Sequence, residues 1–364
     1  MPGRQWLQWL AAEARALFTP GPRLVDELEC VASVLLAIVF GHLADVQNIS
    51  WAAFSGYMVM RGHISESLLR GVLRIIGTLA GALLALWVTP WVWTSPLASA
   101  AALALIGGGA LYGALLSKRS YAWLFVGLTF AMVLLDKLQH PQLALEAFVS
   151  TRIRETLAGT IACVLVSTLS TFTLRRRWPG QPGPQTPGFS WDPDVARHTG
   201  QAALALAMLP LLSAAYRIPE LAQGAVTIMA LMIIPVSGIG KSGLLPVSRR
   251  IVLRLAGCVC GAAMAAAFLL LAHGSALTEA PVLIAGTMLG VMLGRHIENG
   301  KSAIAYGGTQ FTLAILVTLV PDSYLHAEIA PSLERLTGIV VGILLLAPVL
   351  AGWHLVAWAS GREP

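Results

Sequence analysis

A stretch of twelve residues that occurs twice constrains this chain more than any other feature. Arg70–Gly81 reads RGVLRIIGTLAG and Arg250–Gly261 reads RIVLRLAGCVCG, with six identical positions at one constant offset. On a helix, residues three and four apart share a face. Both arginines and both glycines of each copy therefore fall on one stripe, at the start of a long apolar run. The pattern predicts a membrane helix that carries two cations in its first turn and approaches a second backbone closely.

The stripe has a structural and a functional interpretation. Small residues four apart usually serve helix packing in membranes, and we assign this role to Gly77, Gly81, Gly257 and Gly261. Arginines at the start of a span usually anchor it on the cytoplasmic side. An anchor can sit on any face, whereas both copies keep both arginines on the glycine face, which favours a functional role.

Composition indicates a polytopic membrane protein. Hydrophobic residues make up 56% and charged residues 12% of the chain, and the mean hydropathy is +0.73. Soluble domains carry about 25% charged residues. In a soluble protein the net charge of +6 would suggest a nucleic-acid partner. Here we expect it to mark the cytoplasmic face of a bilayer and expect no nucleic acid.

The cysteines and the N-terminal segment give two exclusions. The four cysteines all fall in apolar runs, without the spacing of a disulfide framework or a metal site, so we expect no metal and no cofactor. Glu13 and Arg15 interrupt the first residues before any apolar core, which argues against a cleavable signal peptide. Residues 1–23 instead predict an interfacial amphipathic helix that ends near Pro20.

Twelve apolar segments are candidates for membrane spans, each of which needs about 20 mostly apolar residues. The second and eighth are short, which predicts tilted or broken helices. We therefore expect an all-α polytopic membrane protein with about 12 transmembrane helices. The first six segments are 28–44, 50–61, 70–89, 97–116, 121–136 and 153–174, and the second six are 197–215, 221–237, 250–272, 280–294, 302–320 and 334–357.

A segment rich in proline and glycine divides the chain in two. Arg175–Asp194 reads RRRWPGQPGPQTPGFSWDPD, a composition that predicts no helix, and its three arginines predict a cytoplasmic location. The expected organisation is a membrane repeat 1 at 24–174, a cytoplasmic linker at 175–195, a membrane repeat 2 at 196–358 and a cytoplasmic tail at 359–364.

The positive charges predict that both termini are cytoplasmic. With twelve spans and a cytoplasmic start, nineteen of the 24 Lys and Arg residues fall on the cytoplasmic side. The exceptions are Lys137, Arg152, Arg154, Arg217 and Arg335.

Further echoes support an internal duplication. Tyr121–Phe130 (YAWLFVGLTF) parallels Ser302–Phe311 (SAIAYGGTQF), and Glu155–Gly159 (ETLAG) parallels Glu334–Gly338 (ERLTG). Six spans is an even number. The two six-helix repeats are therefore expected to be parallel, related by a pseudo-two-fold axis along the membrane normal.

Trp51–Ala85 resembles the fusaric-acid-resistance family, which includes the bacterial aromatic-acid exporters. The features that carry the resemblance are a Trp-Ala-Ala opening, a polar loop at Arg61–Ser67, and an Arg-rich turn that leads into Gly77-Thr-Leu-Ala-Gly81. Tyr121–Phe130 is similar to the fifth span of that family and Arg152–Gly159 to its sixth, while the second half is similar more weakly. The chain resembles a compact branch of the superfamily, and it is distantly similar to a fused dimer of the plant aluminium-activated malate channels.

The resemblance implies a secondary transporter in the inner membrane of a Gram-negative bacterium. Its substrates would be small organic, mostly aromatic, carboxylates. It would work in a tripartite efflux system, with a periplasmic adaptor of the membrane-fusion type and, through that adaptor, an outer-membrane channel. We expect the proton gradient to drive export. The protein would work either as a single chain or as a homodimer that docks on the adaptor.

Ionisable groups inside spans are candidates for function, because each costs about 2.5–3.5 kcal/mol at the centre of a helix on insertion scales. An inner set is expected to ring a cytoplasmic vestibule and to bind a carboxylate bidentately. This set is Arg70, Arg74, Arg250 and Arg254.

An outer set marks the start of the sixth span of each repeat: Arg152, Arg154, Glu155, Glu334 and Arg335. Glu155 beside Arg152 or Arg154, and Glu334 beside Arg335, are either interfacial salt bridges or parts of a gate. In a gate, the carboxylates would exchange protons while the arginines receive substrate.

Polar residues in and near other spans are the remaining candidates. Thr129, Thr309 and Gln310 are expected either to bind a carboxylate or ring hydroxyl or to join helices. The similarity of Tyr121–Phe130 to Ser302–Phe311 makes Thr129 and Gln310 equivalent positions. Asp45 is a further candidate for proton coupling, together with Asp136 and His42, with an ordinary loop role as the alternative.

The sequence contains no GxxxxGK[ST], HExxH or GxSxG motif and no Cys/His metal cluster, so neither ATP hydrolysis nor an intramembrane enzyme is expected. Two alternatives to a proton-driven exporter stay open. One is a passive organic-anion channel with the same arginine lining, and the other is a non-transporting membrane scaffold.

Overall fold

The computed structural model describes residues 3–180, 192–216, 218–239, 244–272, 276–300, 303–322 and 328–359. Within these ranges the chain forms fourteen α-helices and one short 3₁₀ turn, η1 (Val236–Gly238), and no strand. The predicted all-α class is therefore confirmed for the described part of the chain. Arg217, which the charge analysis assigned to the periplasm, lies outside the described residues.

A helix is present at each of the twelve predicted spans, as expected where lipid leaves the backbone no other hydrogen-bond partner. Seven of them, α4, α5, α6, α7, α11, α12 and α14, are long and apolar enough to cross a membrane. The first group is α2 (Pro22–Leu43), α3 (Ile49–Val59), α4 (Ile64–Val92), α5 (Pro96–Leu116), α6 (Ser120–Gln139) and α7 (Leu145–Phe172); the second is α9 (Pro193–Ala215), α10 (Leu221–Met232), α11 (Leu244–Ala272), α12 (Ala276–Asn299), α13 (Ala305–Leu319) and α14 (Ala330–Ala359).

Three helices at predicted spans are short for crossing a bilayer, and α13, with 15 residues, is the longest of them. α3 has 11 residues and α10 has 12. At 1.5 Å per residue, each reaches about half of a 30 Å hydrocarbon core. These are the second and eighth predicted spans, so their shortness is as expected.

The predicted helix-free linker differs from the structure at both ends. Leu174–Arg177 form one helical turn, α8, and α9 begins at Pro193. Proline suits a first helical turn because the N–H that it lacks has no partner there. Asp192 caps this helix by accepting hydrogen bonds from the backbone N–H groups of Asp194 and Val195. The prediction that no part of Arg175–Asp194 is helical is therefore wrong, and residues 181–191 lie outside the described part.

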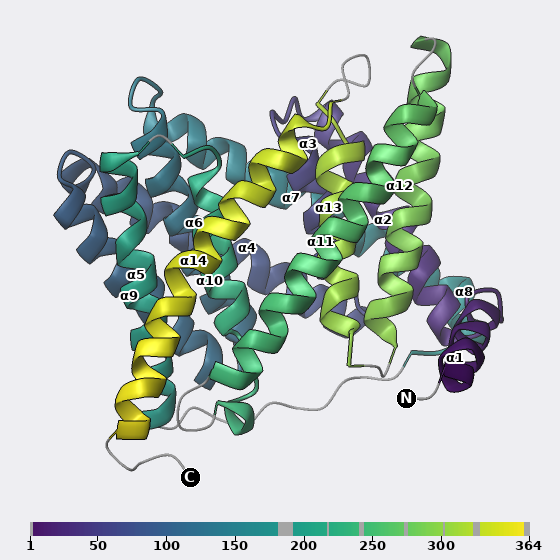
Figure 1. The fold of residues 1–364 in the computed structure, drawn as a ribbon. Helices are drawn as coiled ribbons and strands as arrows, with labels where there is room; N and C mark the ends of the chain where they lie inside the picture. The colour runs from purple at the N-terminus through teal and green to yellow at the C-terminus, as the bar shows by residue number, and fades with distance from the viewer. Residues whose placement is uncertain are drawn as a thin grey trace.

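Helices from the two halves of the chain pack against one another. α5 packs along α9 and α12 along α2, while α6 contacts α10 and α13 contacts α3. α11 and α14 lie obliquely across the front of the molecule in Figure 1. The N-terminal helix α1 (Gly3–Ala16) and the last turn of α14 lie at the same end, which we call the lower end.

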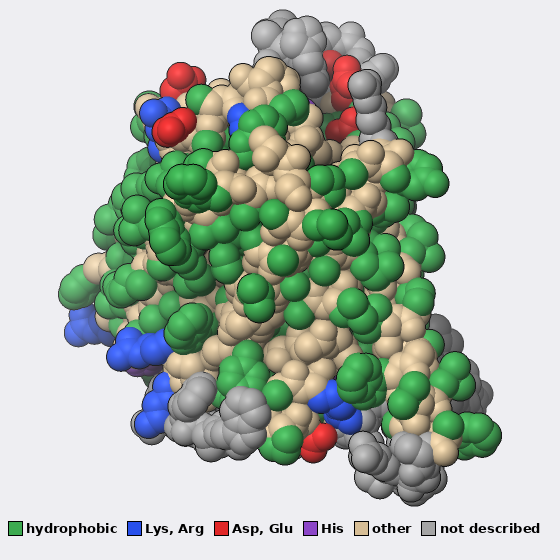
Figure 2. Space-filling model, turned by 90° about the vertical axis from the view of Figure 1, so that its left-hand side faces the viewer, with side chains coloured by type: hydrophobic (Ala, Val, Ile, Leu, Met, Phe, Trp, Pro, Cys, Tyr) green, Lys and Arg blue, Asp and Glu red, His purple; other side chains and the backbone are tan. Residues whose placement is uncertain are grey.

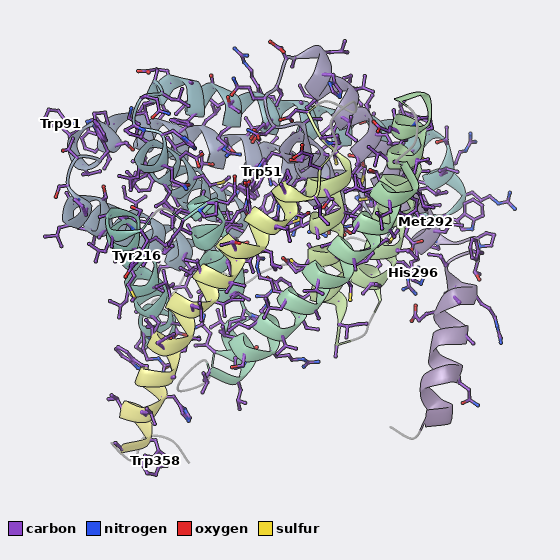
Figure 3. The ribbon with its side chains drawn as sticks, turned by 45° about the horizontal axis from the view of Figure 1, so that its top comes forward. Trp51, Trp91, Tyr216, Met292, His296 and Trp358 are labelled. Atoms are coloured by element: carbon purple, nitrogen blue, oxygen red, sulfur yellow. The ribbon has the colours of Figure 1, made fainter. Side chains whose placement is uncertain are left out.

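The surface has a broad apolar band between two ends that carry charge. Figure 2 shows hydrophobic side chains over the middle of one face, with Lys and Arg gathered toward the lower end. Trp91 and Trp358, which are 81% and 70% exposed, lie on the outside of the molecule, whereas Trp51 lies among the helices (Figure 3). Exposed apolar area of this extent is typical of a multi-pass membrane protein.

Both glycine pairs of the repeated stretch lie where two helices approach closely. A Cβ atom at Gly77 or Gly81 would overlap the backbone of α6 at Ala122 or Val126. A Cβ atom at Gly257 or Gly261 would overlap the backbone of α13 in the same way. α4 and α11 therefore approach α6 and α13 to a distance that only glycine permits.

Candidate functional site

Arg74 is a buried cation without a carboxylate partner among the described residues. Only 3% of its surface is exposed. Nη2 donates a hydrogen bond to the Ser55 hydroxyl at 2.8 Å, and Nη1 donates to the Tyr121 hydroxyl at 3.4 Å. The guanidinium lies over the ring of Phe125, with Cζ at 3.9 Å from the centroid, and at 5.3 Å from that of Phe54. Buried charges are normally paired, so Arg74 has the environment of a cation that lacks its anion.

Arg74 lines a small cavity of about 50 Å³ in the first half of the chain. The walls combine a second arginine and a carboxylate, three hydroxyl-bearing threonines, and aromatic rings. The volume is enough for one or two water molecules. The lining includes Arg152, Glu155, Thr78, Thr129, Thr156, Trp51, Phe54 and Phe125.

Arg152 is neutralised by two carboxylates. Its Nη1 lies 3.0 Å from Glu155 Oε2, and its Nη2 lies 3.3 Å from Asp136 Oδ2. Of the two arginines that the sequence offers as partners of Glu155, Arg152 makes the bridge, and Arg154 is exposed. Oε1 of Glu155 is buried and has no hydrogen-bond partner. Arg74 is therefore the cation of this cavity that no described carboxylate neutralises.

The two terminal nitrogens of Arg254, in the second half, bond neutral groups of the protein, while its Nε has no partner, as in Arg74. Arg254 is 1% exposed. Nη1 donates to the amide oxygen of Gln310 at 2.7 Å and to the Tyr306 hydroxyl at 3.5 Å, and Nη2 donates to the Thr227 hydroxyl at 3.1 Å. Thr309, which was also predicted to bind substrate, directly precedes Gln310 on α13 and is half-buried.

Arg70 and Arg250 lie over tyrosine rings, at 4.7 Å from the centroid of Tyr121 and 4.4 Å from that of Tyr306. Nη1 of Arg70 also donates to the carbonyl of Met58, near the end of α3. This carbonyl is one of the last four of a helix, which have no partner inside the helix. Each arginine pair thus has partners in its own half of the chain, and a ring of four around one vestibule stays a prediction.

The expected equivalence of Thr129 and Gln310 is wrong by four residues. Gly77 of α4 packs against Phe125, and its counterpart Gly257 of α11 packs against Gln310. By the same contacts Tyr121 corresponds to Tyr306, since each bonds the buried arginine of its own half. The position that Gln310 takes in the second half is therefore held by a phenyl ring in the first.

The expected equivalence of Glu155 and Glu334 is wrong by one turn as well. Gly159 packs against Ser55, which bonds Arg74, and Gly342 packs against Thr227, which bonds Arg254. Counting back seven residues from each glycine makes Arg152 and Arg335 equivalent. Counting back four gives Glu155 a counterpart at Gly338, which has no side chain.

A much smaller cavity lies at the corresponding place in the second half. Its volume is about 10 Å³, and Arg335 lines it together with Cys258, Ala314 and Ile339. These three take the places of the threonines Thr78, Thr129 and Thr156. The second half therefore keeps the arginines but has lost the polar cavity.

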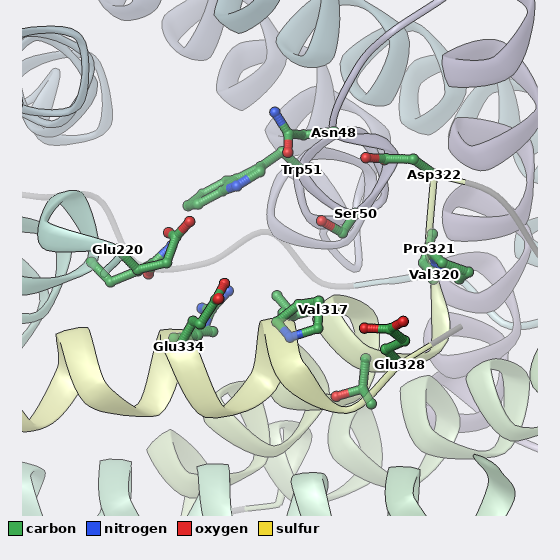
Figure 4. A pocket seen from close by; sticks show the side chains of 14 residues that line it. Asn48, Ser50, Trp51, Glu220, Val317, Val320, Pro321, Asp322, Glu328 and Glu334 are labelled. Atoms are coloured by element: carbon green, nitrogen blue, oxygen red, sulfur yellow. The ribbon is translucent and has the colours of Figure 1, made fainter. Parts of the chain in front are cut away.

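A larger pocket of about 300 Å³ lies at the upper end (Figure 4). Four carboxylates line it, and Trp51 and Arg335 form part of its wall. Arg335 is 6% exposed, its Cζ lies 5.9 Å from the centre of the Trp51 ring, and none of the described carboxylates lies within 4 Å of it. The carboxylates are Glu220, Asp322, Glu328 and Glu334.

Two of these carboxylates lie in loops and have raised pKa values. Partial desolvation in the pocket raises the pKa of Glu220, although more than a third of its surface is exposed, with Asp136 adding to the effect and Arg152 and Arg335 opposing it. Partial desolvation also raises the pKa of the exposed Asp322, against the effect of the hydrogen bond of 2.9 Å that it accepts from the Ile49 N–H. Glu334 is exposed at the rim of the pocket, and Asp45 is exposed in the loop after α2.

Sequence reasoning missed an ionic network at the lower end. Nε of Arg295, on α12, lies 2.6 Å from Asp26 on α2, and Nη2 donates to the carbonyl of Met60 at the end of α3. His296 lies between Glu27 and Glu13, at 2.7 Å and 3.0 Å, and so joins α1 to the bundle. The partners are about 270 residues apart in the chain, so no local spacing indicates them.

The aromatic lining of the cavity was missed as well. Phe54 and Phe125 occur in apolar runs, where an aromatic residue usually indicates packing. Trp51 stands out in the sequence only as the first residue of the Trp-Ala-Ala motif. No signal in the sequence separates these rings from the others.

Comparison with known proteins supports the resemblance. Residues 36–166 match the model of the family described as fusaric acid resistance protein-like. The match contains Arg74, Arg152, Glu155 and Trp51, so the cavity falls almost entirely inside it. Neither a search of curated proteins nor a search of solved structures finds a match.

Proposed function

We propose that this chain, whose residues 36–166 match the fusaric acid resistance protein-like family, is a secondary transporter that exports small aromatic carboxylates. The observation that carries the proposal is the buried Arg74, which has no carboxylate partner among the described residues and lines a cavity with aromatic walls. A guanidinium binds a carboxylate through two parallel N–H···O bonds.

The rest of the cavity suits an aromatic ring with a polar substituent. Phe54, Phe125 and Trp51 offer ring faces and edges, and Thr129 offers a hydroxyl. The cavity has to widen before it takes an organic anion, because its present volume accommodates only water. We therefore regard the described conformation as one in which the site is closed.

We propose that the chain consists of two parallel six-helix repeats related by a pseudo-two-fold axis. Three pairs of contacts support this arrangement: α4 on α6 and α11 on α13, α5 on α9 and α12 on α2, and α3 on α7 and α10 on α14. Export would then proceed by movement of one group of helices against the other. Only in the first repeat would the buried arginine of the repeated stretch be left for the substrate.

Proton coupling follows from competition for one arginine. Glu155 bridges to Arg152 inside the cavity that Arg74 lines. A substrate carboxylate that reaches Arg152 displaces Glu155, which then loses its counter-ion and takes up a proton. Substrate binding and proton uptake are thereby linked, which makes Glu155 the group through which transport would depend on pH.

The location and partners are part of the proposal. The inner membrane with cytoplasmic termini is supported by the cluster of positive charge at the lower end, where α1 lies (Figure 2). An adaptor in the periplasm and an outer-membrane channel follow from the family resemblance alone. The experiment for this part is co-purification of a periplasmic adaptor with the membrane protein.

The test is uptake of labelled p-hydroxybenzoate into inside-out vesicles that contain purified protein, with and without an imposed pH gradient. Proton-driven accumulation that a protonophore abolishes is expected, and Arg74→Gln is expected to reduce it about tenfold or more, the loss of about 1.4 kcal/mol of binding. Arg154→Gln is the matched control, because Arg154 is exposed.

Three results would point elsewhere. Equilibration of the label without accumulation would indicate a passive organic-anion channel. Unchanged uptake by Arg74→Gln would reject the site. A protein that moves none of several aromatic acids, and that retains its fold and stability when all four inner arginines are neutralised, would fit the scaffold.

A further inference from the structure

We propose that the pocket at the upper end is a second anion subsite, in which Arg335 receives the substrate carboxylate once it has passed the Trp51 indole. The inference rests on the proposed function, because the same substrate occupies both subsites in turn. It adds a route and an order to that function.

Trp51 separates the two spaces. It lines both the small cavity, with Arg74, and the large pocket, with Arg335. The guanidinium of Arg152 lies 5.1 Å from the centre of its rings and that of Arg335 lies 5.9 Å away. Arg152 thus lies on the cavity side of the Trp51 indole, and Arg335 lies on its pocket side. Figure 4 shows Trp51 reaching into the pocket toward Glu220 and Glu334.

Arg335 and Gln223 offer unsatisfied hydrogen-bonding groups to the pocket. Both are buried, with 6% and 3% of their surface exposed. Nε of Arg335 has no acceptor and Oε1 of Gln223 has no donor. A buried group left without its partner costs about 1–3 kcal/mol. A ligand that brings a carboxylate to Arg335 and a hydroxyl or protonated group to Gln223 would satisfy both.

The size and charge of the pocket indicate a site of release. Its volume of about 300 Å³ is at the lower limit of small-molecule sites, and it is several times that of the inner cavity. The surrounding carboxylates of Glu220, Asp322, Glu328 and Glu334 repel an anion. An anion held by Arg335 alone among them would bind weakly and leave readily, whereas the carboxylate in the cavity of Arg74, Glu155, is bridged to Arg152.

The test compares equilibrium binding of labelled p-hydroxybenzoate with its flux in reconstituted vesicles, for wild type, Arg74→Gln and three further variants. Arg335→Gln is expected to bind within about twofold of wild type and to transport about tenfold more slowly, because the inner subsite is intact but the exit is not. Trp51→Ala is expected to let the label equilibrate without accumulation. Arg176→Gln, at an exposed arginine away from both cavities, should match wild type in both measurements.

The possible outcomes separate this inference from the proposed function. If Arg74→Gln abolishes binding while Arg335→Gln and Trp51→Ala transport as wild type does, the outer subsite is rejected and the inner one stands. If Arg335→Gln loses binding as fully as Arg74→Gln, there is one shared site and the inference is also rejected. If Arg74→Gln binds normally, the proposed function fails first.

Two milder variants control for the possibility that Arg335→Gln fails to fold. Gln223→Leu keeps the volume of the side chain and removes the free acceptor, so it is expected to lower flux severalfold at unchanged binding. Arg335→Lys keeps the charge without the fork of donors and is expected to restore part of the flux that Arg335→Gln loses. Normal flux in Gln223→Leu together with no rescue by Arg335→Lys would contradict the subsite.

Discussion

Nη1 of Arg254 donates a hydrogen bond of 2.7 Å to the amide oxygen of Gln310. At the equivalent contact in the first half, beside Arg74, stands the ring of Phe125. At this contact the second half thus supplies an amide acceptor, whereas the first half supplies a ring face, and Arg74 bonds only the hydroxyls of Ser55 and Tyr121. The second half fills its own site with this amide, and the first-half site is the one that we propose for an external anion.

Phe125→Gln should fill the first site in the same way. The new amide is expected to accept from Arg74 as Gln310 does from Arg254, and binding of p-hydroxybenzoate should fall about tenfold or more. Equilibrium binding to purified protein checks this. The matched control is Phe125→Leu, which removes the ring without adding an acceptor and should retain more of the affinity. Equal losses in both variants would show that the ring, not the free guanidinium, decides binding.

Gln310→Leu should destabilise the protein. It removes the acceptor that lies closest to Arg254 and leaves a guanidinium that is 1% exposed with only hydroxyl partners. The expected cost is about 1–3 kcal/mol in the free energy of unfolding. Denaturant unfolding in detergent, followed by circular dichroism, measures it. Thr309→Val, at the half-buried neighbouring position, should cost clearly less, and an equal cost would contradict the role of the amide.

The helices themselves are predictable because lipid leaves the backbone little choice. Long apolar runs become helices, and the spacing of Gly77 and Gly81 selects the face that approaches α6. The short α3 was also foreseen from its length. In each case the property belongs to a local stretch of sequence.

The register between the two halves was not predictable in the same way. A shift of four residues is about one helical turn and keeps a side chain on the same face. Matching Thr129 to Gln310, or Glu155 to Glu334, therefore looked consistent with every local pattern. Only contacts with other helices, such as Phe125 against Gly77, show which helical turn of one half corresponds to which turn of the other. The same reason hid the bridge from Arg295 to Asp26, which joins distant parts of the chain.

Glycine at the helix contacts should be irreplaceable, whereas glycine elsewhere should not. Gly81→Ala is expected to lower the free energy of unfolding by about 1–3 kcal/mol, because the new methyl group would meet the Val126 carbonyl and the Thr129 side chain. Gly109 has no other atom within 4 Å of such a group. Gly109→Ala should therefore be neutral or stabilise the helix by up to about 1 kcal/mol. Denaturant unfolding of the two variants compares them, and equal effects would argue against close packing of α4 on α6.

Glu220 should make stability depend on pH. Partial desolvation raises its pKa, although more than a third of its surface is exposed, so the folded protein binds this proton more tightly than the unfolded chain, in which a Glu titrates near 4.3. The stability that follows is fully present below that value and is lost as the pH rises through the higher pKa of the folded state. Glu220→Gln removes this dependence. The unfolding free energy of wild type minus that of the variant should therefore decrease between about pH 4 and pH 8. Glu146→Gln, at an exposed position at the start of α7, serves as the control. An increase of the difference with pH would mean instead that the ionised carboxylate is stabilised by Arg335, and that the outer pocket holds an ion pair.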